Sequence, residues 1–431
     1  MKGGGAIFWS AGDVISSGGW IEDCIFINNT ASGRHGGAID WFRALDSVIN
    51  NCLFINNYAS SDGGALYTGD QGGNSHNLTI SNCQFYNNSA RKHGGAIANQ
   101  MSDSWVYNNT FDGNTAGFSG GSILMKEGPA VNSVIDHCYI YNSFCNQTGD
   151  KYGNGGGSIH IADRNITISN CAIINSTVNI TRGGAILSQG ADCSLVNVTI
   201  QNVETISGNG GAIFWEGKNG YLNNVTIFNS SSNANYNTDA NGGAIYLSGT
   251  YCNLNNISIT TSSSNAGNSS KSANGGAIYV LNTNNVNNNI LTNVIIDDSK
   301  STSDNFNSKG GAIYWGGKAG TLINATISNT LSNGEGGAIY WSGGSPKVEN
   351  ISISYSQTKV VNSTKDASGG AIYSTSISDL TNVYIVDSLA STTDGNIYGG
   401  AIYFNGNTMN NVTVIGSRAT TDSGTSYGGA V

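Results

Sequence analysis

The amino-acid sequence predicts an all-β protein of the right-handed parallel β-helix class, a solenoid of about fourteen coils with three short strands in each. Three observations carry this prediction. A glycine-pair motif recurs at a steady period, a second block with fixed apolar columns lies inside each period, and the composition favours strands over helices. A period near 30 residues is typical of solenoid repeats.

The composition excludes several classes of protein. The chain has 431 residues, with 60 glycines, two prolines and 10% charged residues, whereas charged residues make up about 25% of an ordinary globular domain. The hydrophobic fraction of 38% is high enough to bury a core, which argues against disorder. A net charge of −9 disfavours nucleic acid and anionic membrane surfaces as partners. No apolar run approaches the roughly 18 residues of a membrane span.

The motif Gly-Gly-(Ala/Ser)-(Ile/Leu/Val) occurs fifteen times, at spacings of 26 to 36 residues that average about 30. The copies begin at Gly4, Gly36, Gly63, Gly94, Gly120, Gly156, Gly183, Gly210, Gly242, Gly275, Gly310, Gly336, Gly369, Gly399 and Gly428. No break in period marks a boundary, so residues 1–431 are predicted to form a single domain. Neither end shows an atypical capping repeat, and we therefore expect a segment of a longer protein.

The second block is typified by LNNVTIFNS at residues 222–230. Its first column is apolar in all fourteen copies, and so is the column three residues later apart from Asn109. Residues on one face of a strand are two apart, so Leu222 and Val225 cannot share a face of one straight strand. A corner must separate them, and the column between them is asparagine in twelve of fourteen copies.

Asparagine suits a corner because it tolerates the left-handed backbone region and bonds neighbouring backbone groups. Stacked from coil to coil, these residues are expected to form a structural amide ladder. The column consists of Asn51, Asn82, Asn108, Asn170, Asn197, Asn224, Asn256, Asn293, Asn324, Asn350, Asn382 and Asn411, with Asp23 and His137 as the exceptions.

Each predicted coil thus contains a strand after the glycine pair, a strand before the asparagine corner and a strand after it. Parallel stacking of such coils gives a β-helix, and the handedness of crossover connections makes it right-handed. A β-propeller is the alternative, but its blades need about 40 to 50 residues. The glycines let the returning loop turn tightly, and the isoleucine of the motif is expected to face the core.

One column of the motif is a candidate for function. The residue after the isoleucine is aromatic in seven consecutive copies, namely Phe214, Tyr246, Tyr279, Tyr314, Tyr340, Tyr373 and Tyr403. Earlier copies place Asp40, Ala98, Leu124 and His160 there, a variety that indicates an outward face. Rings one coil apart would stack as a ladder. The six tyrosines are tentative residues for binding carbohydrate or a protein partner, and a stiffening ladder is the structural alternative. The tryptophans one residue later, such as Trp215, should lie in the core.

Cysteine and acidic residues are the other candidates for chemical sites. Cys24, Cys52, Cys83, Cys138 and Cys171 share an inward column and are expected to be small buried side chains rather than disulfides. A polysaccharide lyase or hydrolase needs paired carboxylates. Asp40, Asp46, Asp62 and Asp70, near His35 and His93, are the densest group, and Asp136, His137 and His160 are a thinner one. A bound calcium ion is expected only if the chain is a polysaccharide lyase.

The motif GGAI, combined with Phe-x-x-Asn in FINN at Phe26 and Phe54, FYNN at Phe85 and FDGN at Phe111, resembles the repeats of chlamydial polymorphic membrane proteins. The second half, which contains the segments NVTI and GGAIY, is similar to adhesin-like surface proteins of methanogenic archaea. The predicted fold is pectin-lyase-like. The resemblance implies a non-catalytic, extracellular or cell-surface adhesin. Its expected partners are a cell-surface glycan or protein, and further copies of the chain end to end. The other two interpretations are a β-helix polysaccharide-degrading enzyme and a purely structural spacer.

Overall fold

The computed structural model describes residues 3–10, 16–69, 75–126, 131–146, 154–234, 238–267, 271–281, 286–344, 346–376 and 379–431, and the regular structure in these ranges is β-strand. Equivalent strands of successive coils pair in parallel, which confirms the parallel β-helix. The chain divides into two compact units, unit 1 (residues 1–204 and 216–221) and unit 2 (residues 205–215 and 222–431). The organisation as one domain stays a prediction.

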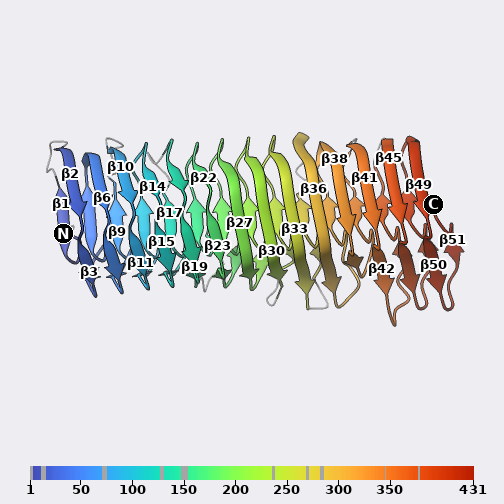
Figure 1. Cartoon of the computed structure of the whole chain (residues 1–431). Helices are drawn as coiled ribbons and strands as arrows, with labels where there is room; N and C mark the ends of the chain where they lie inside the picture. The colour runs from blue at the N-terminus through green and yellow to red at the C-terminus, as the bar shows by residue number, and fades with distance from the viewer. Residues whose placement is uncertain are drawn as a thin grey trace. The chain divides into compact units, whose positions relative to one another are not determined.

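The strand that follows each glycine pair forms one parallel sheet in each unit, with strands in sequence order (Figure 1). In unit 1 the strands are β1 (Ile7–Ser10), β5 (Ile39–Phe42), β9 (Leu66–Thr68), β13 (Ile97–Asn99), β17 (Ile123–Met125), β21 (Ile159–Ile161) and β26 (Ile186–Ser188). In unit 2 they are β29 (Ile213–Trp215), β32 (Ile245–Leu247), β35 (Ile278–Val280), β37 (Ile313–Trp315), β40 (Ile339–Trp341), β44 (Ile372–Ser374) and β48 (Ile402–Phe404).

The strands on either side of the asparagine corner form a second parallel sheet. Before the corner, unit 1 has β2 (Ser16–Glu22), β6 (Ala44–Asn50), β10 (His76–Ser81), β14 (Trp105–Tyr107), β18 (Val134–Asp136) and β22 (Thr167–Ser169). After it come β3 (Ile25–Ile27), β7 (Leu53–Ile55), β11 (Gln84–Tyr86), β15 (Thr110–Asp112), β19 (Tyr139–Tyr141) and β23 (Ala172–Ile174). From β27 (Ser194–Thr205) onward the strand runs through the corner, in β30 (Tyr221–Asn233), β33 (Asn253–Ala266), β36 (Val286–Ser303), β38 (Lys318–Ser328), β41 (Lys347–Ser354), β45 (Asp379–Val386) and β49 (Thr408–Ile415).

Short strands complete the coils. Those that extend the second sheet are β4 (Thr30–Ala31), β8 (Tyr58–Ala59), β12 (Ser89–Ala90), β16 (Thr115–Ala116), β20 (Phe144–Cys145), β24 (Thr177–Val178), β39 (Leu331–Ser332), β42 (Gln357–Val360), β46 (Leu389–Thr392) and β50 (Arg418–Thr421). Those just before a glycine pair are β25 (Thr181–Arg182), β28 (Gly208–Asn209), β31 (Ala240–Asn241), β34 (Ala273–Asn274), β43 (Ala367–Ser368), β47 (Ile397–Tyr398) and β51 (Ser426–Tyr427).

The number of turns is slightly lower than expected. Seven strands that follow a glycine pair are described in each unit, and seven stacked strands delimit six complete turns. The structure therefore describes about twelve turns rather than fourteen. Each glycine-pair motif corresponds to one strand, and a complete turn needs two successive strands.

The asparagine corner has the predicted geometry. All fourteen corner residues have positive φ, between 50° and 58°, including Asp23 and His137. Hydrogen bonds between corner asparagines link several successive coils, but Asn293 donates from Nδ2 to Oδ1 of Asn255, at 2.9 Å, rather than to the corner residue Asn256. Asn197 donates from Nδ2 to Oδ1 of Asn170 at 3.0 Å, and in unit 2 Asn324, Asn350, Asn382 and Asn411 each donate to the residue one coil earlier at 2.8 to 3.1 Å. The corner is thus held by an amide column.

A second left-handed corner follows five residues later and was not predicted. It is occupied by Asn28, Asn56, Asn87, Gly113, Asn142, Asn175, Asn202, Asn229, Thr261, Asp298, Asn329, Tyr355, Asp387 and Gly416, all with positive φ. Its residue type varies too much to stand out as a sequence column. Because of this corner, most coils carry a fourth short strand.

The two glycines of each motif have different roles. The first adopts positive φ, for example 64° at Gly242. The second has no space for a side chain, because a Cβ at Gly243 would overlap the carbonyl oxygen of Gly276 and the backbone of Ser263. The same overlap, with a glycine carbonyl one coil away, recurs from Gly37 to Gly157 in unit 1 and from Gly211 to Gly400 in unit 2. The pair is therefore a place where successive coils approach closely.

The core consists of columns of like residues. The isoleucine column is fully buried, as at Ile245 and Ile313, and so are the tryptophans Trp41, Trp215, Trp315 and Trp341. Phe54 and Phe85 stack at 4.8 Å between ring centroids. The cysteines are free thiols, all of them buried except the partly exposed Cys24, which confirms the prediction that they act as small core side chains.

The asparagine of Phe-x-x-Asn forms a buried ladder in unit 1. Asn88 is fully buried. Its Nδ2 donates to the carbonyl oxygen of Phe54 at 3.0 Å and to Oδ1 of Asn114 at 3.1 Å, while its Oδ1 accepts from the backbone and side-chain nitrogens of Asn57. Each asparagine therefore bonds the backbone groups that the second corner leaves unpaired, which explains why Phe and Asn recur together.

We predict that Gly243→Ala lowers the free energy of unfolding by about 2 to 3 kcal/mol, because the new Cβ overlaps backbone atoms that cannot move without separating two coils. The measurement is urea unfolding followed by far-UV circular dichroism. Gly267→Ala is the matched control, since no atom lies within 4 Å of its Cβ position. An equal loss in both variants would contradict the account of the glycine pair.

Removing a buried ladder amide is expected to cost more than removing an exposed one. Asn88→Ala should lose about 2 to 3 kcal/mol, because it leaves the Phe54 carbonyl and the Asn57 amide unsatisfied. Asn82→Gly, at an exposed corner where glycine keeps the positive φ, should lose less than about 1 kcal/mol. Chemical unfolding of both variants compares them, and a ranking in the opposite order would disprove the assignment.

Candidate functional site

The predicted aromatic column is a continuous stack in unit 2. Ring centroids from Phe214 through Tyr246, Tyr279, Tyr314, Tyr340 and Tyr373 to Tyr403 lie 4.4 to 5.2 Å apart, with interplanar angles of 4° to 14°. Strands β29, β32, β35, β37, β40, β44 and β48 position one ring each. The register of these strands, which pairs Tyr314 with Tyr340 and Tyr340 with Tyr373, brings the rings face to face.

The column is more buried than its sequence variety indicated. Tyr246 and Tyr340 are only 8% and 7% exposed, and the other tyrosines are partly buried. Each ring face covers the next ring, so within the stack the faces are closed to a sugar ring. What the column can offer a ligand is its edge and its row of hydroxyl groups.

The hydroxyl groups of Tyr279, Tyr340 and Tyr373 stay protonated at neutral pH. Burial raises the pKa of Tyr279, Tyr340 and Tyr373 above the ordinary value, and in Tyr373 the negative charge of Glu335 adds to the effect. A neutral phenol both donates and accepts a hydrogen bond. The row therefore suits ligands that carry many hydroxyl groups.

The residue immediately before each glycine pair forms a second column, which we call the pre-glycine column. Its members include His35, Asp62, His93, Ser119, Arg182, Asn209, Asn241, Asn274, Lys309, Glu335, Ser368, Tyr398 and Tyr427. A pre-glycine residue contacts the aromatic column one coil later: His35 stacks on Tyr67 at 4.3 Å, and Lys309 Nζ donates to the Tyr340 hydroxyl at 3.0 Å. This column was not predicted from the sequence, although its residues are mostly polar and their position just before each glycine pair can be recognised there.

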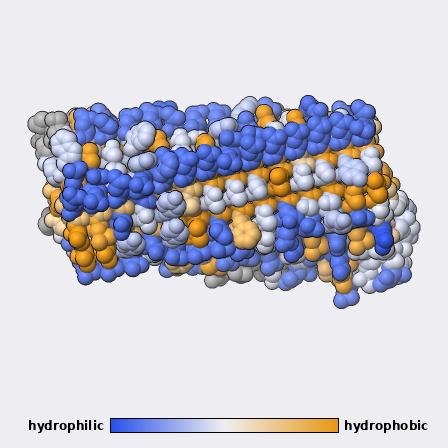
Figure 2. Space-filling model, viewed as in Figure 1, coloured by the Kyte–Doolittle hydropathy of each residue, from blue (hydrophilic) through white to orange (hydrophobic). Residues whose placement is uncertain are grey.

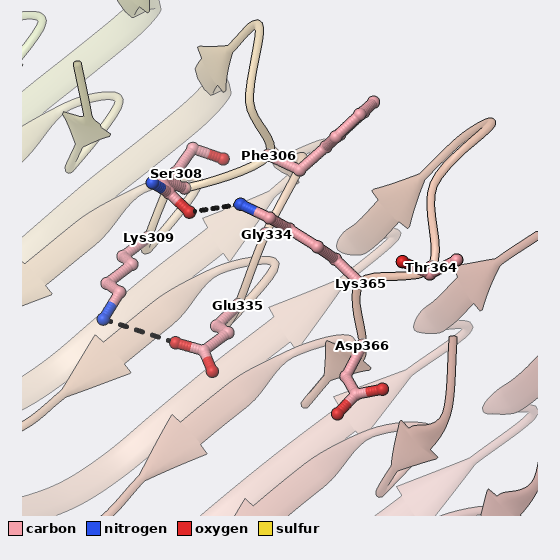
Figure 3. A pocket seen from close by; sticks show the side chains of 9 residues that line it. Phe306, Ser308, Lys309, Gly334, Glu335, Thr364, Lys365 and Asp366 are labelled. Atoms are coloured by element: carbon pink, nitrogen blue, oxygen red, sulfur yellow. Dashed lines mark hydrogen bonds and ion pairs between the residues drawn. The ribbon is translucent and has the colours of Figure 1, made fainter. Parts of the chain in front are cut away.

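A cavity of about 420 Å³ opens beside the aromatic column in unit 2, and Lys309 and Glu335 line it (Figure 3). Its other walls are Phe306, Asn307, Ser308, Gly334, Thr364, Lys365 and Asp366. Lys365 reaches across two coils and donates from Nζ to Oδ1 of Asn307 at 2.7 Å. The cavity thus combines two ammonium groups, two carboxylates and one aromatic ring.

Lys309 links the cavity to the aromatic column. Its ammonium lies 3.5 Å from a Glu335 carboxylate oxygen and 4.5 Å from the centre of the Tyr340 ring. Burial by itself would lower the pKa of Lys309, but the hydrogen bond with Tyr340 and the charge of Glu335 outweigh it and raise the pKa. The site therefore presents a fixed positive charge between a carboxylate and a phenol.

In unit 1 the two columns are mixed, and they hold charged and apolar groups as well as Tyr67. Asp62, whose side chain is 4% exposed, lies 3.0 Å from Lys126 Nζ and 3.4 Å from His35 Nδ1. Burial opposes ionisation of Asp62, but the contact with His35 and the charge of Lys126 prevail and hold its pKa well below the ordinary range. The carboxylate is thus a buried anion with fixed partners.

A chain of hydrogen bonds continues along unit 1. The Ser119 hydroxyl lies 2.7 Å from Nδ1 of His93 and 2.9 Å from Nδ1 of His160, and Nε2 of His160 lies 2.9 Å from Oε1 of Gln189. Burial lowers the pKa of His160 to about 4 and also lowers that of His93, so both rings are neutral at pH 7. Ser119 itself is fully buried. The arrangement is a closed network rather than an exposed nucleophile.

The remaining acidic candidates are scattered. Asp46 lies in β6 of the second sheet and accepts from Asn77 at 2.7 Å, whereas Asp40 lies in β5 of the first sheet, and Asp70 is outside the described residues. Asp136 and His137 occupy a corner and do not join His160. Within the described ranges, no group of three or more His, Cys, Asp or Glu side chains is arranged to hold a metal ion.

The asparagine ladder borders a shallow groove in unit 2. Figure 2 shows hydrophilic and hydrophobic residues gathered in bands on one face. The groove has a volume of about 400 Å³ and is lined by Asn224, Asn256, Ile257, Ser258, Asn293, Ile295, Asn324 and Thr326. It lacks charged groups along this lining, so it is a weaker candidate than the cavity at Lys309.

The comparison with protein families agrees with the resemblance seen in the sequence. The Chlamydia polymorphic membrane protein repeat matches residues 51–69 and 82–100. Each segment begins at a corner asparagine, passes through Phe-x-x-Asn and ends just after the glycine-pair strand. One match thus corresponds to one stretch of coil in unit 1. None of the curated proteins matches the chain.

Among solved structures, the chain is similar to the catalytic domain of a GH87 alpha-1,3-glucanase. One complex of that domain with nigerose has 13% identity and a TM-score of 0.41, and the match covers 81% of this chain and 61% of the other. A second complex with nigerose has 12% identity and a TM-score of 0.37, and that match covers 90% of this chain and 61% of the other. This chain therefore spans under two thirds of those domains. No helix in the described part of the chain could cross a membrane. The findings show polymorphic membrane protein-type repeats on a parallel β-helix.

Proposed function

We propose that this chain is a non-catalytic, adhesin-like segment of a cell-surface protein, and that it binds a cell-surface glycan through the aromatic column of unit 2. The repeat match supports a surface role, because it belongs to a family of membrane proteins. The observation that carries the binding proposal is the joining of the tyrosine stack to the 420 Å³ cavity through Lys309 and Glu335.

The chemistry of this site matches a glycan. A sugar presents several hydroxyl groups that both donate and accept, and the site opposes them with phenol hydroxyls, an ammonium and carboxylates. Phe306, at the cavity wall, supplies an apolar surface for the ring carbons of a sugar. The positions of Tyr246, Tyr279, Tyr314, Tyr340, Tyr373 and Tyr403 are fixed by stacking, so little conformational entropy is lost on binding.

The charged network of unit 1 supports a structural role rather than a catalytic one. A glycosidase needs two carboxylates facing a bond from opposite sides. The Asp62 carboxylate is instead enclosed and held by Lys126 and His35. A polysaccharide-degrading enzyme is the alternative that the experiments must distinguish, and a binding-inactive spacer is the other.

The proposal predicts that the double variant Tyr314→Phe/Tyr340→Phe loses binding to at least one class of glycan that the wild type binds, while its fold is unchanged. Phenylalanine keeps the stack but removes two hydroxyl groups, including the one that accepts from Lys309. The measurement is a glycan array with wild type and variant, with circular dichroism as the control for folding. If the wild type binds neither glycans nor cells, the structural-spacer alternative is supported. If both proteins bind equally, the tyrosine hydroxyl groups do not take part in binding.

The two roles of Asp62 make different predictions. Because its pKa is lowered in the folded state, its ionised form stabilises the protein above about pH 4, the unfolded pKa, and this contribution fades as the pH falls further. Asp62→Asn should therefore cost about 2 kcal/mol at pH 7 and less at pH 3. Urea unfolding at the two pH values tests this.

Asp46→Asn is the matched control for this variant, since Asp46 is exposed and has a positive φ, which asparagine also tolerates. It should change stability by less than about 0.5 kcal/mol. Release of reducing ends or unsaturated products from polysaccharides by the wild type, abolished by Asp62→Asn or Asp40→Asn without unfolding, would overturn the non-catalytic proposal.

A further inference from the structure

Four exposed rings gather around one corner in unit 1. Trp105 is 50% exposed, Tyr107 39% and Tyr139 50%, and the His137 side chain is 53% exposed. Strand register places Trp105 beside Val134 and Tyr107 beside Asp136 in adjacent coils, and Tyr139 beside Thr110. The rings of Tyr107 and His137 meet edge to face at 5.5 Å. We call these four residues and Asp136 the corner patch.

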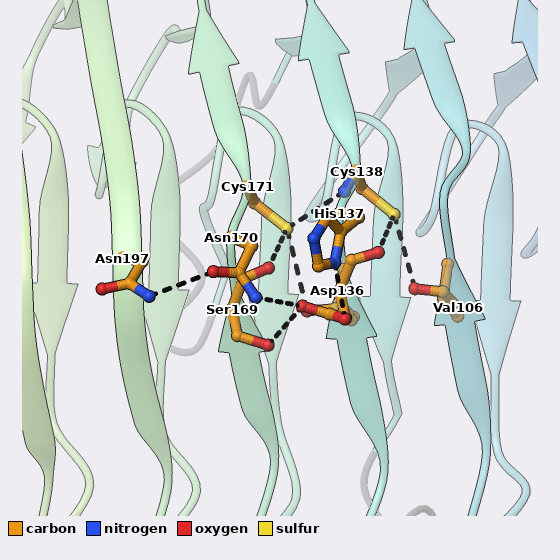
Figure 4. A network of polar contacts seen from close by, with 9 residues as sticks. Val106, Asp136, His137, Cys138, Ser169, Asn170, Cys171 and Asn197 are labelled. Atoms are coloured by element: carbon orange, nitrogen blue, oxygen red, sulfur yellow. Dashed lines mark hydrogen bonds and ion pairs between the residues drawn. The ribbon is translucent and has the colours of Figure 1, made fainter.

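His137 is one of the two departures from the asparagine column, and its exposed ring is part of the patch. The ladder bypasses it, because Asn170 donates from Nδ2 to Oδ1 of Asp136 at 2.8 Å instead of bonding the corner residue (Figure 4). Ser169 donates to the same oxygen at 2.6 Å, and Nδ1 of His137 lies 2.7 Å from the other oxygen. The His137 ring is therefore not needed to hold the ladder.

The Asp136 carboxylate is a prearranged polar group. Partial burial opposes ionisation, but the hydrogen bonds from Ser169, His137 and Asn170 lower its pKa and keep it charged. With Nδ1 engaged at the carboxylate, Nε2 of the exposed imidazole ring is the nitrogen that a ligand can reach. The patch thus sets an imidazole and a carboxylate between exposed aromatic faces.

Unlike the stacked tyrosines of unit 2, the rings of Trp105 and Tyr139 are half exposed, so their faces are accessible to a planar apolar surface. The apolar face of a pyranose ring is such a surface, and aromatic rings favour contact with it. Asp103 and Asp112 lie on the coil of Trp105, one coil before Asp136, and their negative charge disfavours uronates, sulfated sugars and phosphates.

We propose that the corner patch is a binding site for a neutral glycan, with pyranose rings stacked on Trp105 and Tyr139 and ring hydroxyls bonded to His137 and Asp136. This site lies in unit 1 and uses no tyrosine of the aromatic column, so it stands independently of the function proposed for unit 2.

Titration of the whole chain with neutral hexa-oligosaccharides of glucose, mannose and galactose, followed by tryptophan fluorescence, tests the proposal. At least one of them should shift the emission of the wild type to shorter wavelength, because a stacked sugar removes water from Trp105. His137→Asn restores the usual corner residue and should weaken the affinity about tenfold without unfolding. Trp105→Ala should abolish the fluorescence change.

Trp20→Ala is the matched control. Trp20 is 66% exposed and lies on the same outward column, three coils away through Val48 and Thr79, beside a corner occupied by Asp23. It should bind as wild type does. The Tyr314→Phe/Tyr340→Phe variant should also give an unchanged titration, which separates this site from that of unit 2. Absence of any response to neutral sugars, a preference for oligogalacturonate, or equal losses in Trp20→Ala and Trp105→Ala would each overturn the proposal.

Discussion

In each unit, every coil is hydrogen bonded in register to the coil beside it, and each residue therefore lies next to its equivalent one coil away. This parallel in-register stacking is the constraint from which the other features follow. It selects residues that pack well against copies of themselves: isoleucine and phenylalanine in the core, asparagine at the corners, and tyrosine or tryptophan along the first sheet. A charged residue is repelled by an identical charge one coil away, so it can remain only where the adjacent coils carry a different residue in that column.

The glycine pair meets this constraint where the backbone itself is in contact. The first glycine turns the chain with positive φ, and the second permits the carbonyl of the next coil to lie where a side chain would be. At the corners, the asparagine ladders hold successive coils together through hydrogen bonds. The buried ladder through Asn57 and Asn88 satisfies backbone groups that no strand can pair. Loss of either device separates coils, and so it affects the whole stack rather than one site.

The same stacking also decides where a ligand can bind. Rings that stack on each other leave only their edges accessible, as the tyrosine column shows. The two sites that we propose for recognition lie where a column is interrupted: at Lys309 and Glu335, where opposite charges alternate next to the tyrosines, and at His137, where an imidazole replaces the ladder amide. A regular coil is therefore a scaffold, and its exceptions are the places with binding chemistry.

The sequence alone determined the fold class, the asparagine corner and the inward columns, because these depend on periods of two and of about thirty residues that can be counted in one chain. It also located the tyrosine column. Only the tertiary structure decided how exposed that column is, since burial depends on rings in neighbouring coils and on covering loops. The second corner escaped prediction because Asn202, Thr261, Tyr355 and Gly416 share a backbone conformation and not a residue type. The contacts of Asp62 with Lys126, 64 residues later, and of Lys309 with Tyr340 arise from coil register and side-chain reach, which no spacing within one repeat reveals.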